Sequence, residues 1–283
     1  MLTESRHNEL KAKALKMRQR IFKAMWRAGG GHIGGSLSPV EVLTVLYNEI
    51  LKIDPARPDW PGRDRFILSK GHACVALYAA LAEAGFFSVK ELLTFTKPGT
   101  RLGGHPDMRK VPGADASTGA LGHGFPYGAG IALGAKKIGA PFRVFALLGD
   151  GESQEGTVWE AAMFAAQHGL DNLVAITDYN KLQAMDRVEK VVNLEPLRAK
   201  WEAFGWESAE VDGHDMRAIH EALSAIPFRQ GKPSAIIAHT TKGKGISFME
   251  NVPIWHFRLP NAEELQVVFR DLEMTAEELG VME

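Results

Sequence analysis

The chain has 283 residues, of which 45% are hydrophobic and 24% charged, a composition that is typical of globular proteins and excludes a mainly disordered chain. Its 33 lysine and arginine residues nearly balance 34 aspartate and glutamate residues, and the net charge of -1 gives no reason to expect a nucleic acid or an anionic membrane as partner. The longest apolar runs fall far below the roughly 20 residues that cross a bilayer, the N-terminus lacks a secretory signal pattern, and the single cysteine, Cys74, favours a reducing cytoplasm.

A long helix is expected over residues 3–28. Apolar residues recur there at the spacing of one helical face, on an otherwise basic segment, so this arm should pack on the body of the protein. The apolar positions are Leu10, Ala14, Met17, Ile21 and Met25. The pattern stops at Gly29-Gly30-Gly31, and a second helix is expected after Ser38-Pro39, since serine and proline are typical of helix starts. His32 lies between the two, on an expected flexible turn.

From residue 114 onward, short β-rich runs alternate with helical segments. Strands are expected at about 142–148, 173–177, 207–211 and 235–240, and helices at about 157–168, 197–204 and 216–225. This alternation predicts a doubly wound α/β fold with a mainly parallel sheet, whose ligands bind at the carboxyl ends of the strands. A glycine-rich stretch over about 97–126 is expected to form a long functional loop, and residues 262–279 a short acidic helix. The sequence shows no repeat or linker, so one domain over 1–283 is expected.

Polar side chains follow two neighbouring strands of the expected sheet. Gly149-Asp150-Gly151 comes directly after the strand at 142–148, and Asn180 follows the next strand. The glycines permit a sharp turn and leave room for a diphosphate to approach the main chain. Because parallel neighbouring strands end at one edge, Asp150 and Asn180 are expected side by side, where with diphosphate oxygens they supply the oxygen ligands that Mg²⁺ prefers. A Gly-Asp-Gly turn alone is weak evidence, since most such turns are structural.

The two halves together, separated by 28 residues from Gly151 to Asn180, resemble the thiamine diphosphate signature. The chain is similar to the N-terminal part of a transketolase, in the form in which that enzyme is split into two polypeptides. The resemblance extends from about residue 32 to 256, and its further motifs are Gly31-His32-Ile33-Gly34-Gly35-Ser36, residues 64–72, Gly104-His105-Pro106-Asp107, residues 117–122, residues 241–245 and Trp255-His256.

The resemblance implies how the cofactor would be held. Asp150, the side chain of Asn180 and the carbonyl of Leu182 would coordinate Mg²⁺, or another divalent cation such as Ca²⁺ or Mn²⁺. Gly151 would donate its amide to the diphosphate. The loop containing Gly119 and Leu121 would lie against the cofactor, with Leu121 pressing on the thiazolium.

The resemblance also implies roles for four histidines and one glutamate. His72 and His256 would lie near the diphosphate and the reacting carbon, whereas His32 and His105 would hydrogen-bond sugar hydroxyl groups and move protons. Histidine suits this work because its unperturbed pKa is about 6.5. Glu155 matches a position that reaches across the subunit interface in the family, although at a helix start it also complements the helix dipole. Lys242 and Lys244 are either solvated or close to phosphate.

The family further implies a missing half. The glutamate that activates the cofactor belongs to a pyrimidine-binding domain, and we expect that domain on a second polypeptide, in an obligate complex of α₂β₂ type. The expected reaction is transfer of a two-carbon ketol unit from a ketose phosphate to an aldose acceptor. The alternatives are a 2-oxoacid-decarboxylating component, similar to a dehydrogenase α-subunit or to deoxyxylulose-phosphate synthase, and a non-catalytic nucleotide-binding module.

Two departures from the family pattern concern the site. His123 stands where many transketolases have glutamine, and Phe257-Arg258-Leu259 follows His256 where split subunits commonly have glycine and lysine. The second departure alters the expected substrate contacts near His256.

Overall fold

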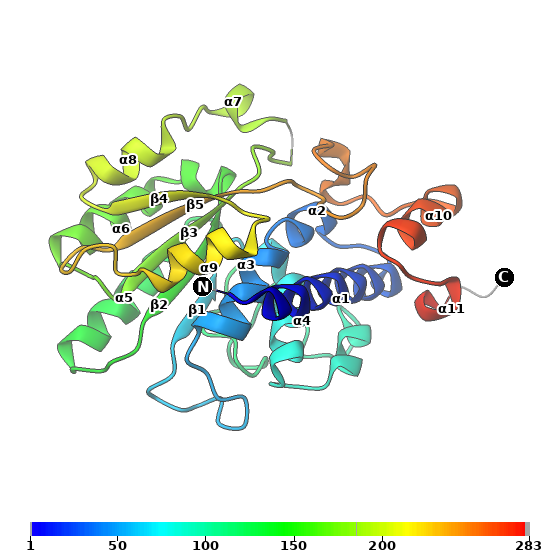
Figure 1. Ribbon diagram of the computed structural model, residues 1–283, viewed down its shortest axis with the longest axis horizontal. Coiled ribbons are helices and arrows are strands. Elements are labelled where there is room, and N and C mark those ends of the chain that lie inside the picture. The colour runs from blue at the N-terminus through cyan, green and yellow to red at the C-terminus, as the bar shows by residue number, and fades with distance from the viewer. Residues whose placement is uncertain (1, 185, 281–283) are drawn as a thin grey trace.

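The computed structural model describes residues 2–184 and 186–280; residues 1, 185 and 281–283 of the expected domain lie outside the described residues. Within this part, five strands form one sheet in the order β1-β2-β3-β5-β4, and every ladder is parallel (Figure 1). The strands are β1 Arg65–Leu68, β2 Val144–Gly149, β3 Leu173–Tyr179, β4 Glu207–Asp212 and β5 Ser234–His239. The predicted fold class is confirmed.

Helices cover both faces of the sheet, and two apolar cores form between the layers. Successive residues of β2 alternate between the two cores. Phe145 and Leu147 belong to one core and Ala146 and Leu148 to the other, as the two-residue period of a strand requires. The first core packs against α1 Glu4–Ala28, α3 Val40–Val45, α4 Cys74–Ala84 and α9 Met216–Ser224. The second packs against α5 Gly124–Lys137, α6 Gly156–Gln167 and α8 Leu197–Ala203.

The predicted N-terminal helix is confirmed as α1. All five residues of its predicted stripe are buried. Thr3 caps the first turn by accepting a hydrogen bond from the Arg6 amide at 3.2 Å, and Gly29 ends the helix with a φ of 75°, a left-handed conformation that glycine adopts without strain. The other predicted strands and helices after residue 140 lie within two residues of their predicted bounds, except at the C-terminus.

Two expectations about local structure were wrong, and three elements were not predicted. The segment after the glycines is not all loop, because α2 Ile33–Leu37 begins directly after His32. Residues 262–279 form two helices, α10 Ala262–Asp271 and α11 Ala276–Leu279, because Glu273 adopts a φ of 51° and Thr275 caps the second one. The strand β1 and the helices α4 and α5 were not predicted. β1 is only four residues long, too short for a periodic pattern, and α5 begins inside the expected loop 97–126.

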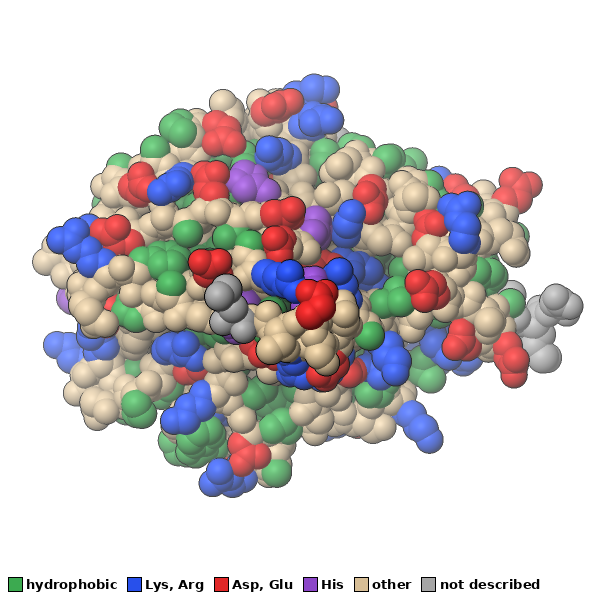
Figure 2. Space-filling model, in the orientation of Figure 1, with side chains coloured by type: hydrophobic (Ala, Val, Ile, Leu, Met, Phe, Trp, Pro, Cys, Tyr) green, Lys and Arg blue, Asp and Glu red, His purple; other side chains and the backbone are tan. Residues whose placement is uncertain are grey.

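The remaining elements are short. They are α7 Val188–Val191, the 3₁₀ turns Gly71–Ala73, Val89–Thr94, Gly151–Gln154 and Pro253–His256, and the π turn Leu46–Ile50. No helix in residues 2–184 and 186–280 is both long and apolar enough to cross a membrane. Acidic and basic side chains are intermixed over the face in Figure 2, in keeping with the near-zero net charge.

Candidate active site

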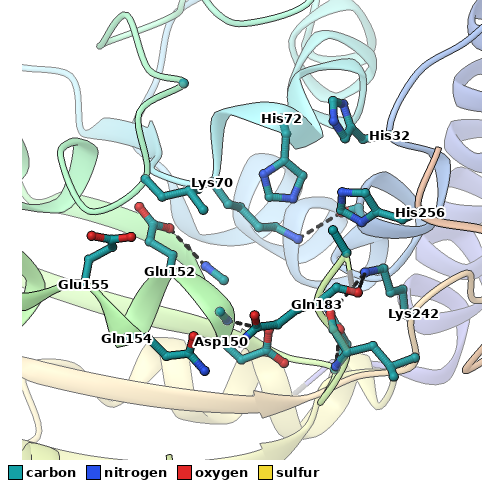
Figure 3. Close-up of a pocket in the computed structure, with 18 of the residues that line it drawn as sticks. His32, Lys70, His72, Asp150, Glu152, Gln154, Glu155, Gln183, Lys242 and His256 are labelled. Carbon is teal, nitrogen blue, oxygen red and sulfur yellow. Dashed lines mark hydrogen bonds between the residues drawn. The ribbon is translucent and has the colours of Figure 1, made fainter. Parts of the chain in front are cut away.

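A cavity of about 450 Å³ opens at the carboxyl edge of the sheet, where β2 and β3 end (Figure 3). Every residue to which the family resemblance assigns a role lines this cavity, although these residues come from segments more than 200 positions apart. They are His32, His72, His105, Gly119, Leu121, Asp150, Gly151, Glu155, Asn180, Leu182 and His256. The structure thus brings all of them together in one place. It also adds residues to which the resemblance gave no role, namely Gly35, Lys70, Gly149, Glu152, Gln154, Gln183, Ala184 and Lys242.

Asp150 and Asn180 lie at the same edge of the sheet, as their spacing predicts. Gly149, at the end of β2, pairs with Asp178 of β3, so the segments that follow the two strands leave the sheet at nearly the same level. The carboxylate of Asp150 joins the two turns, accepting from the amide of Gly151 at 2.7 Å and from that of Lys181 at 2.5 Å. The side-chain oxygen of Asn180 accepts from the Leu182 amide at 3.1 Å. Side-chain oxygen atoms of Asp150 and Asn180 therefore gather at these two turns.

The buried position of Asp150 perturbs its acidity. Burial, and then the negative charge of Asp178, raises the pKa of Asp150 to about 7. The backbone N–H groups of Gly151 and Lys181 oppose this shift. A carboxylate held in such surroundings gains from a nearby cation, because opposite charge favours the ionised form. This donor set fits a hard divalent ion.

A buried ion pair lies at the cavity, with one of its members in the lining. Lys70 and Asp178 are almost fully buried and directly paired, and Lys70 also donates to the Gly35 carbonyl at 2.9 Å. Asp178 accepts further hydrogen bonds from Ser38, at 2.6 Å, and from Thr240 and Asn180. Burial raises the pKa of Asp178, but the ammonium of Lys70 and these hydrogen bonds together bring it below its usual value. Asp178 is therefore an ionised anchor that orients Asn180.

Lys242 reaches the cavity from the segment after β5. Its ammonium donates to the carbonyl oxygens of Leu182 and Gln183, at 3.0 and 3.1 Å (Figure 3). Burial lowers the pKa of Lys242 to about 8, against the attraction of Asp150. Lys244, by contrast, lies outside the cavity, 3.3 Å from the carboxylate of Glu250. Of the two lysines considered from the sequence, the structure brings only Lys242 to the site.

Three histidine rings form a cluster on the wall opposite Asp150 (Figure 3). The ring centroid of His32 lies 5.3 Å from that of His72 and 5.2 Å from that of His256. Burial, and then the charge of Lys70, lowers the pKa of His72 to about 2. Burial and Lys242 lower the pKa of His256 to about 4. Burial and His105 also lower that of His32. The rings are therefore neutral near pH 7, and each can both donate and accept a hydrogen bond.

Glu152 fixes the loop that holds Gly119 and Leu121. Its buried carboxylate accepts from the hydroxyl of Ser69 at 2.5 Å and from the amides of Gly122 and Gly149, at 3.0 and 3.1 Å. The loop is close enough that a β-carbon on Gly71 would lie 2.7 Å from the Gly119 nitrogen, so only glycine fits there. Nothing in the sequence around Glu152 signals this buried role, because a glutamate at a helix start is ordinarily explained by the helix dipole.

The rim of the cavity is more exposed. Leu121 is 36% exposed, and Glu155 is also exposed. His123 does not line the cavity; it precedes α5, and its ring nitrogen lies 3.0 Å from the Leu121 carbonyl. Phe257 is 57% exposed and meets the His32 ring edge to face, with 5.1 Å between centroids.

Two buried polar atoms of the cavity lack hydrogen-bond partners among the described residues, His256 Nδ1 and Gln183 Nε2. Such atoms are uncommon in folded proteins unless a ligand or water completes them. Within residues 2–184 and 186–280, no three His, Cys, Asp or Glu side chains gather to hold a metal ion. A cation at Asp150 would therefore also be coordinated by a side-chain amide oxygen, a main-chain carbonyl oxygen and oxygens of the ligand. This is the arrangement expected of a metal bound together with a diphosphate. The residues fit such a group.

Comparison with known proteins gives a consistent result. Residues 11–277 match the family model described as transketolase, thiamine diphosphate binding domain. The chain is 43% identical over 270 residues to a subunit of the apulose-4-phosphate transketolase of Phocaeicola vulgatus, covering 95% of this chain and 96% of that protein. It is 48% identical over 242 residues to the 6-deoxy-6-sulfo-D-fructose transketolase subunit SqwG of a Clostridium species, covering 86% and 88%.

Solved structures are similar over part of their length. A transketolase from Pichia stipitis in complex with sedoheptulose 7-phosphate superposes with a TM-score of 0.89 at 30% identity, covering 95% of this chain and 41% of that one. A transketolase from Campylobacter jejuni gives 0.87 at 31% identity, with 94% and 43% covered. The chain spans about two-fifths of the length of these solved proteins.

Proposed function

Because this chain belongs to the transketolase thiamine diphosphate-binding family, we propose that it is the N-terminal subunit of a two-chain transketolase. With its partner it transfers a two-carbon ketol unit from a ketose phosphate to an aldose acceptor. Two similar proteins of nearly the same length are named as transketolase subunits, which supports a divided enzyme. The observation that carries the proposal is the gathering of Asp150, Asn180 and the histidine cluster around one cavity.

Thiamine diphosphate, when bound, supplies the carbanion chemistry of the reaction. This chain's part is to hold it and keep water away. Asp150, the Asn180 side chain and the Leu182 carbonyl would hold Mg²⁺, or Ca²⁺ or Mn²⁺, against the diphosphate, and the Gly151 amide would donate to it. The Gly151 amide already donates to Asp150. To donate to the diphosphate, it would share its hydrogen between the two acceptors or exchange one for the other.

The loop that carries Gly119 and Leu121 would lie on the thiazolium side. Leu121 is exposed enough to contact a ligand, and Glu152 and the close approach of Gly71 support the main chain behind it. Contact between this apolar side chain and the cofactor would be favourable, because it removes apolar surface from water. Glu155, on the exposed rim, would face the partner.

The histidines would handle the hydroxyl groups of the sugar. Neutral imidazoles can accept a proton at one nitrogen while donating at the other. His32 and His105 would bind donor hydroxyls and move protons, and His72 and His256 would lie close to the diphosphate and the reacting carbon. The lowered pKa values of His32, His72 and His256 keep these rings available as acceptors at neutral pH.

We propose that the partner subunit carries the pyrimidine-binding domain and the catalytic glutamate, and that the assembly is α₂β₂ and cytoplasmic. The solved transketolases are more than twice as long as the segment they share with this chain, which leaves room in them for such a domain.

The test uses this chain, its partner and an equimolar mixture of the two. Each sample receives Mg²⁺, thiamine diphosphate, a ketose phosphate and an aldose acceptor, and the new ketose is measured. Turnover in the mixture alone supports the proposal. Full turnover by this chain alone would refute the two-chain assignment, and consumption of pyruvate without any ketol transfer would support a 2-oxoacid-decarboxylating enzyme instead.

A further inference from the structure

The side-chain amide of Gln183 is buried at the cavity wall with its nitrogen lacking an acceptor among the described residues. The backbone of the same residue is well held: its N–H donates to the Asp186 carbonyl at 2.9 Å, and its carbonyl accepts from Lys242 at 3.1 Å. The side chain is therefore presented from a fixed position. A buried amide that has lost water without gaining an acceptor is unfavourable, and at a cavity a bound ligand or a water molecule supplies the acceptor.

The amide lies against Gly151. A β-carbon on Gly151 would be 3.1 Å from Cγ, 3.2 Å from Cδ and 3.4 Å from Nε2 of Gln183. Figure 3 shows Gln183 between Asp150 and Lys242. The unpartnered N–H group thus lies beside the Gly151 turn, where the proposed function places the diphosphate. It also lies near Lys242, which comes from the segment after β5.

The neighbouring groups select an acceptor-rich anion. The ammonium of Lys242 is a donor that lies at the Gln183 carbonyl. The side-chain nitrogen of Gln183 is a second donor, without an acceptor among the described residues, and it lies against Gly151. Diphosphate oxygens accept hydrogen bonds and carry negative charge, so they satisfy both donors, whereas a ligand hydroxyl or amine would satisfy them less well.

We propose that Gln183 is a further cofactor-binding residue, and that its Nε2 donates to an oxygen of the bound diphosphate. This inference rests on the proposed function. Gln154 provides a contrast within the same cavity, because its Nε2 donates to the Val192 carbonyl at 2.7 Å. The Gln154 nitrogen therefore already has an acceptor, whereas the Gln183 nitrogen has none among the described residues, and the inference depends on this difference.

The test measures thiamine diphosphate binding to the two-chain complex by titration calorimetry at saturating Mg²⁺. Gln183→Met keeps the length of the side chain and removes the donor, so affinity should fall about tenfold to a hundredfold, the range for loss of a hydrogen bond to a charged group. Gln183→Glu places a carboxylate against the diphosphate and should weaken binding further. The matched control Gln154→Met should bind like the wild type. Without cofactor, Gln183→Met should unfold at the same temperature as the wild type or higher, since an unpartnered donor is removed.

The outcomes separate the two claims. If the wild-type complex binds the cofactor and Gln183→Met binds it equally well, the inference is overturned and the proposed function stands. Equal weakening by Gln154→Met and Gln183→Met, or a lowered unfolding temperature of Gln183→Met without cofactor, would show a structural role and would also overturn it. If the wild-type complex binds no thiamine diphosphate, both claims fail.

Discussion

The ammonium of Lys242 lies 3.0 Å from the carbonyl oxygen of Leu182. The same oxygen is a proposed ligand of the divalent cation, and two cations cannot approach it closely together without strong repulsion. If a cation bound this oxygen, Lys242 would have to move from the carbonyl, and a bound diphosphate would offer it a new partner. The lysine is a positive charge already directed at the place where the metal and the diphosphate are proposed to bind.

Replacing Lys242 by methionine should weaken thiamine diphosphate binding to the two-chain complex by roughly tenfold to a hundredfold, the range for a hydrogen bond to a charged group. Lys244→Met is the matched control, because that lysine lies outside the cavity beside Glu250. Calorimetric titration of both variants tests the difference. Equal affinities of the two variants would show that Lys242 does not contact the cofactor.

His105→Ala should leave cofactor binding intact and reduce donor turnover by about a hundredfold or more, the range for loss of a proton-transferring side chain. His105 lies against Gly119 at the cavity wall and is not among the proposed metal ligands. The measurement compares cofactor affinity with kcat for a ketose phosphate, and His168→Ala, outside the cavity, serves as control. Normal donor kinetics would remove His105 from the site.

Phe257→Gly should move the acidic limb of the kcat profile to higher pH. Phe257 packs edge to face on His32, and burial is the main cause of the lowered pKa of His32. Removing the ring exposes His32, so its pKa rises toward the ordinary value and the neutral form is lost at higher pH. Ile254→Gly changes the same exposed segment without removing that ring contact. An identical profile for Phe257→Gly and wild type would contradict this role.

A pH dependence of stability is expected from Glu41. This buried carboxylate pairs with Arg18 at 2.7 Å and with His214 at 3.0 Å. Burial raises its pKa, but His214 and Arg18 together lower it from 4.5 to about 2. A lowered carboxyl pKa gives stability that is present above about pH 4.5 and is lost as the pH falls toward 2, about 3 kcal/mol in this case.

Urea unfolding of the chain between pH 2 and 7 measures this loss. Glu41→Gln should flatten the acidic part of the curve and lower stability at pH 7, since Arg18 is left buried without its partner. A variant curve parallel to that of the wild type would show that other carboxylates cause the acid sensitivity.

The sequence predicted four of the five strands, and the meeting of Asp150 with Asn180, for a physical reason. Alternating strands and helices locate the strand ends, and the glycines around Asp150 mark a turn there, so the meeting of Asp150 and Asn180 follows from the topology of parallel strands. The histidines came from the resemblance to a family, because no spacing rule joins His32 to His256 over more than 200 residues.

Other features have no local signal. Lys70, Asp178 and Glu152 are buried charges, whereas charged residues in a sequence predict exposed positions. Only the pairing of Lys70 with Asp178, and the hydrogen bonds that Glu152 accepts, show why they are inside. The break between α10 and α11, by contrast, had a readable signal. Thr275 followed three residues later by Glu278 forms a capping box, which marks a new helix start.

The most direct test of the site is a calorimetric titration of thiamine diphosphate into the two-chain complex, with Mg²⁺ and with a chelator, for the wild type and Asp150→Asn. Loss of a metal-supporting group commonly weakens binding tenfold to a hundredfold, and loss of this charged ligand should cost at least about a hundredfold. The account predicts tight Mg²⁺-dependent binding by the wild type, little binding by the folded variant, and no Mg²⁺ dependence of what binding is left. Equal Mg²⁺-dependent affinities of the wild type and Asp150→Asn would contradict it.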